Sequence, residues 1–131
     1  MRDETQRWLE YAEENLASAS VLLDSDLYNP CLQNAQQAVE RLLKALLVES
    51  AVKIRKTHSI GELMVALSQL GLSVSLSEDE IDLLDSIYLP SKYPVGSALP
   101  DLDPDRAICE RCVSAAQRVR DSVVGLLGGS N

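Results

Sequence analysis

The sequence is poor in aromatic residues and lacks the cysteine spacing of a disulfide-rich protein. Phenylalanine is absent, and one Trp and four Tyr make up the aromatic content of 4%. We therefore expect a core of Leu, Val, Ile and Ala, of which Leu and Ala favour helices. The three cysteines are an odd number without the spacing of a disulfide framework, which fits a reducing compartment.

The sequence also lacks long apolar runs and an excess of basic over acidic residues. No run approaches the roughly 20 apolar residues that span a membrane, and the charged start Met1–Arg7 does not resemble a signal peptide. The net charge is −8, whereas nucleic-acid affinity comes largely from Lys and Arg. We expect a cytoplasmic protein that does not bind membranes and that binds nucleic acid only with a partner, although one local basic pocket is compatible with this charge.

Apolar residues recur at helical spacing in two long stretches. The stripe from Trp8 to Leu23 predicts a helix over residues 2–25. The stripe from Leu32 to Leu47 predicts a second helix that runs to about Ala51, with Asn29 as its N-cap and Pro30 as its first residue. The short link between them implies that these helices are antiparallel neighbours.

Capping signals predict two shorter helices. Ser59–Glu62 and Ser77–Glu80 both match the capping box, in which the side chains of the first and fourth residues bond to each other's backbone N–H. Gly71 is expected to end the first of these helices, and Pro90 the second.

The rest of the chain predicts one long loop and a final helix. Residues 89–103 contain three prolines and one glycine and are expected to be irregular, and loops of this length are often functional. Asp103–Pro104 is expected to start the last helix, which Gly128–Gly129 ends. The prediction is a single all-α domain over residues 1–131, an up-and-down bundle of about five helices.

Cys109 and Cys112 form a lone C-x-x-C pair. A redox or zinc site would need a βαβ context or a second cysteine pair. We interpret both as small core residues, because they lie one helical turn apart and Cys112 falls on the apolar stripe. Because the sequence also lacks a Gly-rich phosphate loop, a Ser-His-Asp order and a metal-binding cluster, we predict no metal, no cofactor and no catalytic residue.

Two candidate sites, the Glu40–Lys44 pair and His58, each have alternative interpretations. Glu40 and Lys44 are spaced i, i+4, which suits either a solvated helix face or the lining of a pocket on a central helix. His58, the only histidine, precedes the Ser59 cap and follows a basic cluster over residues 53–56. It is either a simple boundary residue or an anion-binding group at a helix N-terminus.

A third candidate lies in the long loop. Lys92 and Tyr93 are held between Pro90 and Pro94. The prolines restrict the backbone of this pair, which favours contact with a ligand or partner. The alternative is that Tyr93 closes the open end of the bundle.

Three segments together resemble the HEPN domain family. Tyr28–Leu47 resembles the second helix of HEPN domains, where an A-x-Q-A-x-E-x-x-x-K-A-L-like run is typical. Lys56–Leu63 resembles the K-x-H-x-L-x-x-L stretch of that family, and Lys92–Pro94 resembles its R-Y-P motif with Lys in place of Arg. The three motifs occur in the family's order, and the resemblance extends from Trp8 to about Val124.

The resemblance implies a helical bundle that is commonly dimeric. Prokaryotic HEPN proteins are often encoded beside, or fused to, a minimal nucleotidyltransferase, which suggests a role in binding nucleotide or substrate. Some members are toxins of toxin–antitoxin pairs and act as metal-independent ribonucleases. Those enzymes use an Arg followed, a turn or more later, by a His. Here Arg55 is only three residues before His58, and the final helix has no His.

The sequence thus leads to two hypotheses about function. The first is a homodimeric, non-catalytic module that binds a nucleotide or a minimal nucleotidyltransferase. Its pocket is expected to be lined by Glu40, Lys44, His58, Lys92 and Tyr93. The alternative is a HEPN-type ribonuclease toxin, in which His58 would act as general acid–base with Arg55 or Lys92.

Overall fold

The computed structural model of the chain describes residues 1–53, 56–92 and 104–128. The described residues form five α-helices and no β-strand. The helices are α1 (Asp3–Asp24), α2 (Tyr28–Glu49), α3 (Ile60–Gln69), α4 (Glu78–Lys92) and α5 (Arg106–Gly128). The predicted all-α bundle of about five helices is therefore confirmed. None of the described helices is both long and apolar enough to cross a membrane.

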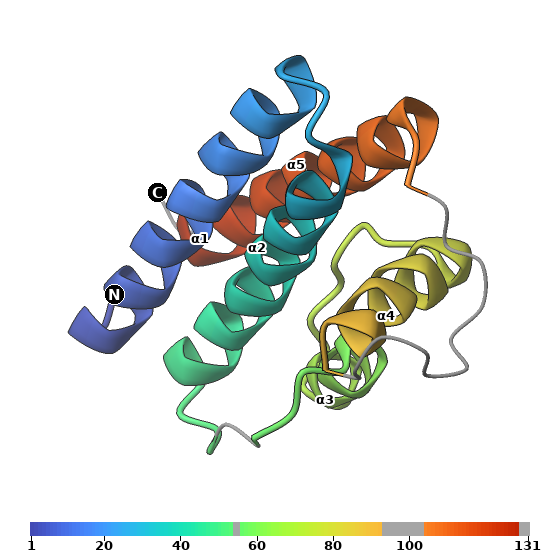
Figure 1. Ribbon diagram of the computed structural model, residues 1–131. Coiled ribbons are helices and arrows are strands. Elements are labelled where there is room, and N and C mark those ends of the chain that lie inside the picture. Colours follow the sequence, from blue (N-terminus) through green and yellow to red (C-terminus); the bar gives the residue numbers. More distant parts are fainter. Residues whose placement is uncertain (54–55, 93–103, 129–131) are drawn as a thin grey trace.

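Helix α2 is the centre of the bundle. It lies antiparallel to α1, α5 crosses behind this pair, and α3 and α4 lie beyond α2 on its other side (Figure 1). Helix α2 contacts all four other helices, and 14 of its 22 residues are buried. Because α2 is packed on so many sides, few of its positions are exposed to water, and charged residues on it can be buried.

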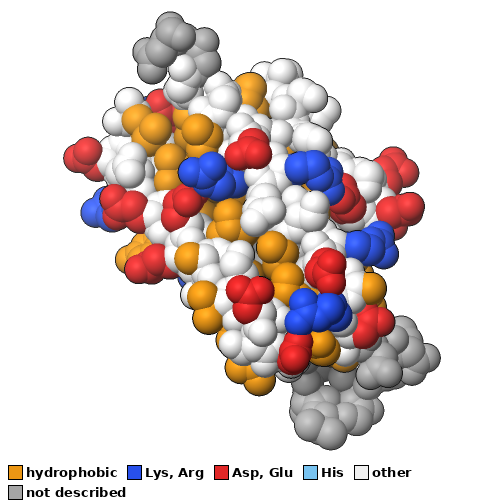
Figure 2. Space-filling model, turned by 90° about the horizontal axis from the view of Figure 1, so that it is seen from above, with side chains coloured by type: hydrophobic (Ala, Val, Ile, Leu, Met, Phe, Trp, Pro, Cys, Tyr) orange, Lys and Arg blue, Asp and Glu red, His pale blue; other side chains and the backbone are white. Residues whose placement is uncertain are grey.

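The buried core is aliphatic, as the composition predicts. It consists of Leu, Ala, Val, Ile and Cys side chains, and no aromatic ring is among the buried residues that the structure describes. On the face seen in Figure 2, acidic, basic and hydrophobic side chains are interspersed, and no continuous basic surface forms. This agrees with the negative net charge.

The predicted helix ends are correct for some helices. Ser59 Oγ accepts from Glu62 N at the start of α3, and Ser77 and Glu80 form both bonds of the capping box at α4. Gly71, with φ of 75°, ends α3. The predicted caps at Ser59 and Ser77 and the stop at Gly71 are confirmed.

Three predicted boundaries are wrong by two residues. Helix α2 begins at Tyr28 and not at Pro30, which lies within the first turn, where backbone N–H groups lack helical partners in any case. Helix α4 continues for two residues past Pro90 and ends at Lys92. Proline removes only its own backbone N–H from the helical hydrogen bonds, so this position near the helix end tolerates it. Helix α5 starts at Arg106, and Asp105 Oδ1 accepts from Ile108 N (2.8 Å) as its cap in place of Asp103.

Helix α2 also ends earlier than predicted. Its last residue is Glu49, and Ala51 adopts a left-handed conformation with φ of 61°. Ala51 N then bonds to Val48 O and Val52 N to Leu47 O, which is the Schellman pattern of a helix C-terminus. Periodicity alone did not indicate this end, because alanine is not a residue that usually occupies the left-handed position.

Candidate functional site

Glu40 and Lys44 form a buried ion pair on α2. Lys44 Nζ lies 2.9 Å from Glu40 Oε2, and Lys44 and Glu40 are only 6% and 8% exposed. The solvated-face interpretation of this pair is therefore wrong. The reason is tertiary: the packing of the other helices around α2 covers both side chains.

His58 joins this pair from the segment between α2 and α3. Its Nδ1 atom is 3.2 Å from each carboxylate oxygen of Glu40, and because a carboxylate only accepts, Nδ1 donates. The ring stacks on Tyr88 of α4, with centroids 4.6 Å apart and planes 20° apart. The side chain is 44% exposed, so it brings the buried pair into contact with the surface.

Gln36 is a fourth member, one helical turn before Glu40. Its Nε2 atom donates to Glu40 Oε1 and to the His58 carbonyl oxygen, both at 3.4 Å. Both partners are acceptors, so they determine the amide orientation and leave the buried Oε1 without a partner among the described residues. A buried polar atom of this kind costs about 1–3 kcal/mol. Gln36, Glu40, Lys44 and His58 are called the Glu40 cluster below.

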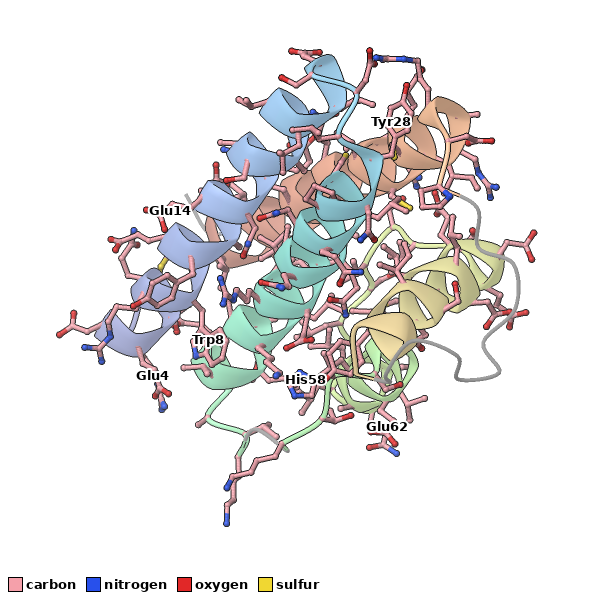
Figure 3. The ribbon with its side chains drawn as sticks, viewed as in Figure 1. Glu4, Trp8, Glu14, Tyr28, His58 and Glu62 are labelled. Atoms are coloured by element: carbon pink, nitrogen blue, oxygen red, sulfur yellow. The ribbon has the colours of Figure 1, made fainter. Side chains whose placement is uncertain are left out.

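Aromatic rings lie at both ends of the Glu40 cluster. Lys44 Nζ is 5.7 Å from the ring centroid of Trp8 on α1, and Tyr88 stacks on His58 at the other end. Figure 3 shows Trp8 and His58 on opposite sides of the C-terminal half of α2. In the sequence, Trp8 falls on the apolar stripe of its helix, and nothing near Tyr88 indicates that it contacts His58. The i, i+4 spacing of Gln36 and Glu40 is the one signal that could have revealed the fourth member.

The structure brings together three of the five predicted site residues. Glu40, Lys44 and His58 meet in the Glu40 cluster. Lys92 is the last residue of α4, and its side chain lies outside the described residues, as does the whole of Tyr93 with most of the predicted loop.

The N-terminus of α3 holds a carboxylate of the chain itself. Asp85 of α4 accepts from Ile60 N (2.6 Å) and Gly61 N (3.1 Å). These N–H groups are the ones that would bind an anion at the start of a helix. His58 therefore contacts Glu40 beside this helix start, while Asp85 occupies the anion position. The sequence contains no local signal for this contact, which joins residues 25 and 24 positions apart.

The cysteines belong to the core. Cys109 and Cys112 are 0% and 1% exposed, and burial raises the pKa of each thiol to about 12. Thiols in this state are poor nucleophiles and poor metal ligands, so the interpretation as core residues is confirmed. Within residues 1–53, 56–92 and 104–128, no three His, Cys, Asp or Glu side chains gather in a metal-binding group.

The Glu40 cluster is suited to binding. Donors from Lys44, His58 and Gln36 occupy both oxygens of Glu40, so the carboxylate is not available as a general base. Lys44 has further N–H donors beyond its bond to Glu40. The His58 ring adds Nε2, which donates when the ring is protonated. These are groups that recognise an anionic or polar ligand.

Comparisons with known proteins place the chain in a family. The HEPN domain family matches residues 5–126, whereas comparison with curated proteins finds no match. Among solved structures, TT1696 from Thermus thermophilus is 29% identical with a TM-score of 0.73, and the alignment covers 93% of this chain and 97% of that one.

Two further solved structures show the same fold. A HEPN domain protein from Thermotoga maritima (tm0613) is 22% identical with a TM-score of 0.68, over 93% of this chain and 98% of that one. ST0689, described as an archaeal HEPN homologue, is 22% identical with a TM-score of 0.63, over 96% and 98%. The five-helix architecture and the family match over nearly the whole chain lead to one conclusion: this chain belongs to the HEPN domain family.

Proposed function

We propose that the domain is a non-catalytic binding module that recognises a nucleotide, or the substrate of a nucleotidyltransferase, through the Glu40 cluster. The observation that supports this proposal is a buried ion pair linked to a half-exposed histidine. A buried ion pair adds little to stability once the cost of removing both charges from water is counted. A functional role accounts for its place among core side chains that are mostly aliphatic.

The chemistry of the cluster supports binding over catalysis. Glu40 holds Lys44 and His58 in place, and the remaining N–H groups of Lys44 and Nε2 of a protonated His58 act as donors to phosphate oxygens. We include Lys92 and Tyr93 in this site on the strength of the family resemblance. Their contribution is part of the proposal.

The biological setting is proposed from the same resemblance. We infer that the protein is a cytoplasmic homodimer that acts with a minimal nucleotidyltransferase, as one half of a toxin–antitoxin-type pair. Sedimentation velocity of the purified chain is expected to give a mass of about 29 kDa, twice the 14.3 kDa of one chain. A single 14.3 kDa species at high concentration would contradict the dimer.

Calorimetric titration with ATP in the absence of metal tests the binding module. Saturable binding is expected, and His58→Ala should weaken it at least tenfold, since His58 is the exposed member of the cluster. Lys56→Ala is the matched control, because Lys56 is a nearby exposed cation outside the cluster. Absence of binding at millimolar ATP, or equal binding by His58→Ala and the unchanged protein, would refute the proposal.

The ribonuclease alternative predicts a different result. Expression of the chain would arrest growth, the purified protein would cleave RNA without metal, and His58→Ala would abolish both effects. The binding module predicts no cleavage by either protein.

A further inference from the structure

A second candidate site lies near the Glu40 cluster, in a groove between α1 and α2 that combines charged and aromatic side chains. It is lined by Glu4, Arg7, Trp8, Tyr11 and Arg41 and has a volume of about 410 Å³, within the range of about 300–1,000 Å³ of small-molecule sites. Trp8 lines this groove and also contacts the Glu40 cluster, since Lys44 Nζ lies 5.7 Å from the centroid of its ring. Figure 3 shows Glu4 and Trp8 on the N-terminal half of α1. We call this surface the Arg41 groove.

Arg41 is held in place by a chain of side-chain hydrogen bonds. Its Nη1 donates to Asn15 Oδ1 (2.7 Å), Asn15 Nδ2 donates to Asn34 Oδ1 (3.0 Å), and Asn34 Nδ2 donates to Pro30 O (2.9 Å). Both amides therefore use their oxygen and their nitrogen, which fixes their orientation. The guanidinium also lies 5.4 Å from the ring centroid of Tyr11. A cation that is fixed before binding loses less conformational entropy when a ligand arrives.

The arginines of the groove are not neutralised by the chain itself. Neither Arg7 nor Arg41 makes an ion pair with a described residue, whereas Arg106, Arg118 and Arg120 pair with Asp26, Glu80 and Glu13. Arg41 bonds only to a neutral amide, so most of its N–H groups are available. Glu4 is the one acid of the lining, and it disfavours an anion at its own end of the groove.

The aromatic side chains add a different kind of contact. Tyr11 is 53% exposed, a large fraction for an aromatic ring, and Trp8 is partly buried. Their faces can stack on a flat ring, with an energy of about 1–3 kcal/mol per nucleic-acid base in known complexes. Planar guanidinium groups next to them bind phosphate in bidentate fashion.

We propose that the Arg41 groove binds a nucleoside phosphate, with its base stacked on Trp8 or Tyr11 and its phosphate on Arg7 and Arg41. The inference rests on the proposed function and deepens it, because it adds a base- and phosphate-binding surface next to the Glu40 cluster. The same chemistry is present in a free nucleotide and in the 5′-phosphorylated end of an RNA strand.

Calorimetric titration of the full chain with AMP, adenosine and ribose 5-phosphate tests this groove. AMP is expected to bind at least tenfold more tightly than either fragment, because only AMP offers both ring and phosphate. Arg7→Gln and Arg41→Gln should each weaken AMP binding about tenfold and leave adenosine binding unchanged. Arg7 is exposed, so its variant keeps the test valid even if Arg41→Gln disturbs the fold.

Arg111→Gln is the matched control, since it removes the same charge from an exposed position on α5. It should bind AMP as the unchanged protein does. Equal AMP binding by Arg7→Gln, Arg41→Gln and Arg111→Gln would overturn the proposal, as would AMP and adenosine binding with equal affinity.

Two further experiments distinguish a free nucleotide from an RNA end as the ligand, and the Arg41 groove from the Glu40 cluster as the binding site. The first compares AMP with a 5′-phosphorylated hexaribonucleotide. If Arg41→Gln weakens the binding of both, the groove is supported, and the ligand that binds more tightly shows whether the groove prefers a free nucleotide or an RNA end. Loss of ATP binding in His58→Ala but not in Arg41→Gln would overturn the groove and retain the proposed function. No nucleotide binding at all would overturn both.

Discussion

Glu40 and Lys44 place two charges inside a bundle that is filled with aliphatic side chains. The pair is satisfied because Lys44 donates to Glu40, and Glu40 also accepts from His58 and Gln36. The stability of this buried cluster depends on every member being present. Removal of one charge leaves the other buried without its partner, and that is the costly state.

Stability measurements can separate the pair from its single members. Lys44→Met should lower the free energy of unfolding by about 3–5 kcal/mol, because the Glu40 charge stays buried without its main partner. The double variant Glu40→Leu/Lys44→Met should have a stability equal to or above that of the unchanged protein. Urea denaturation followed by circular dichroism measures both.

The pair of Arg118 and Glu80 is the control for this experiment. Arg118 has a 44% exposed side chain, so Arg118→Met should cost no more than about 1 kcal/mol. If Glu40→Leu/Lys44→Met had as low a free energy of unfolding as Lys44→Met, the prediction would be contradicted, because the ion pair would then stabilise the fold.

Helices α1, α2 and α3 all end with the same backbone arrangement. In each, one residue has a positive φ: Asp26 (58°), Ala51 (61°) and Gly71 (75°). The two residues after the cap then bond back to the last turn in the Schellman pattern. Only glycine adopts this conformation without steric cost, so Ala51 is strained where Gly71 is not.

Exchanging these two residue types should have opposite effects. Ala51→Gly should raise the free energy of unfolding by about 0.5–1 kcal/mol, because it relieves the left-handed strain. Gly71→Ala should lower it by about 1 kcal/mol. No atom lies within 4 Å of a Cβ at Gly71, so the backbone alone accounts for this loss. Thermal unfolding curves give both values, and changes of the same sign would contradict the explanation.

The start of α3 depends on α4. Asp85→Ala removes the acceptor of Ile60 N and Gly61 N and should cost about 1–2 kcal/mol, the size of a lost N-cap. Asp82→Ala is the control, because Asp82 is an exposed acid of the same helix. It should change the free energy of unfolding by less than about 0.5 kcal/mol. Equal losses for the two variants, measured by urea denaturation, would count against a capping role for Asp85.

The molecule as a whole is organised around α2, and its core includes all three cysteines. Burial raises the pKa of Cys109 and Cys112 to about 12 and also raises that of Cys31. In the unfolded chain these thiols ionise near their ordinary pKa of 9.0. Above that pH the unfolded state therefore binds fewer protons than the folded state, and stability decreases as pH rises.

This difference predicts alkaline destabilisation. The free energy of unfolding should fall between about pH 9 and 12, by up to about 1.4 kcal/mol per pH unit for each buried thiol. The double variant Cys109→Ala/Cys112→Ala should show a clearly shallower decrease in denaturant titrations over this range. If its slope matched that of the unchanged protein, other groups would be responsible.

Much of the fold could be predicted from short-range patterns. Apolar spacing predicts the five helices, and the caps at Ser59 and Ser77 and the stop at Gly71 are correct because each acts within a few residues of itself. The aliphatic core and the buried cysteines likewise follow from composition and periodicity. Boundaries at Pro30, Pro90 and Asp103 were wrong because proline and aspartate tolerate several positions near a helix end.

Contacts between distant segments depend on packing and had no local signal. The i, i+4 spacing of Glu40 and Lys44 suits a solvated face as well as a buried pair, and only the four helices around α2 decide between them. In the same way, His58 reaches Glu40 and Asp85 reaches the start of α3 because α3 and α4 fold back onto α2. Spacing along one helix determines which residues share a face, but burial of that face depends on its neighbours.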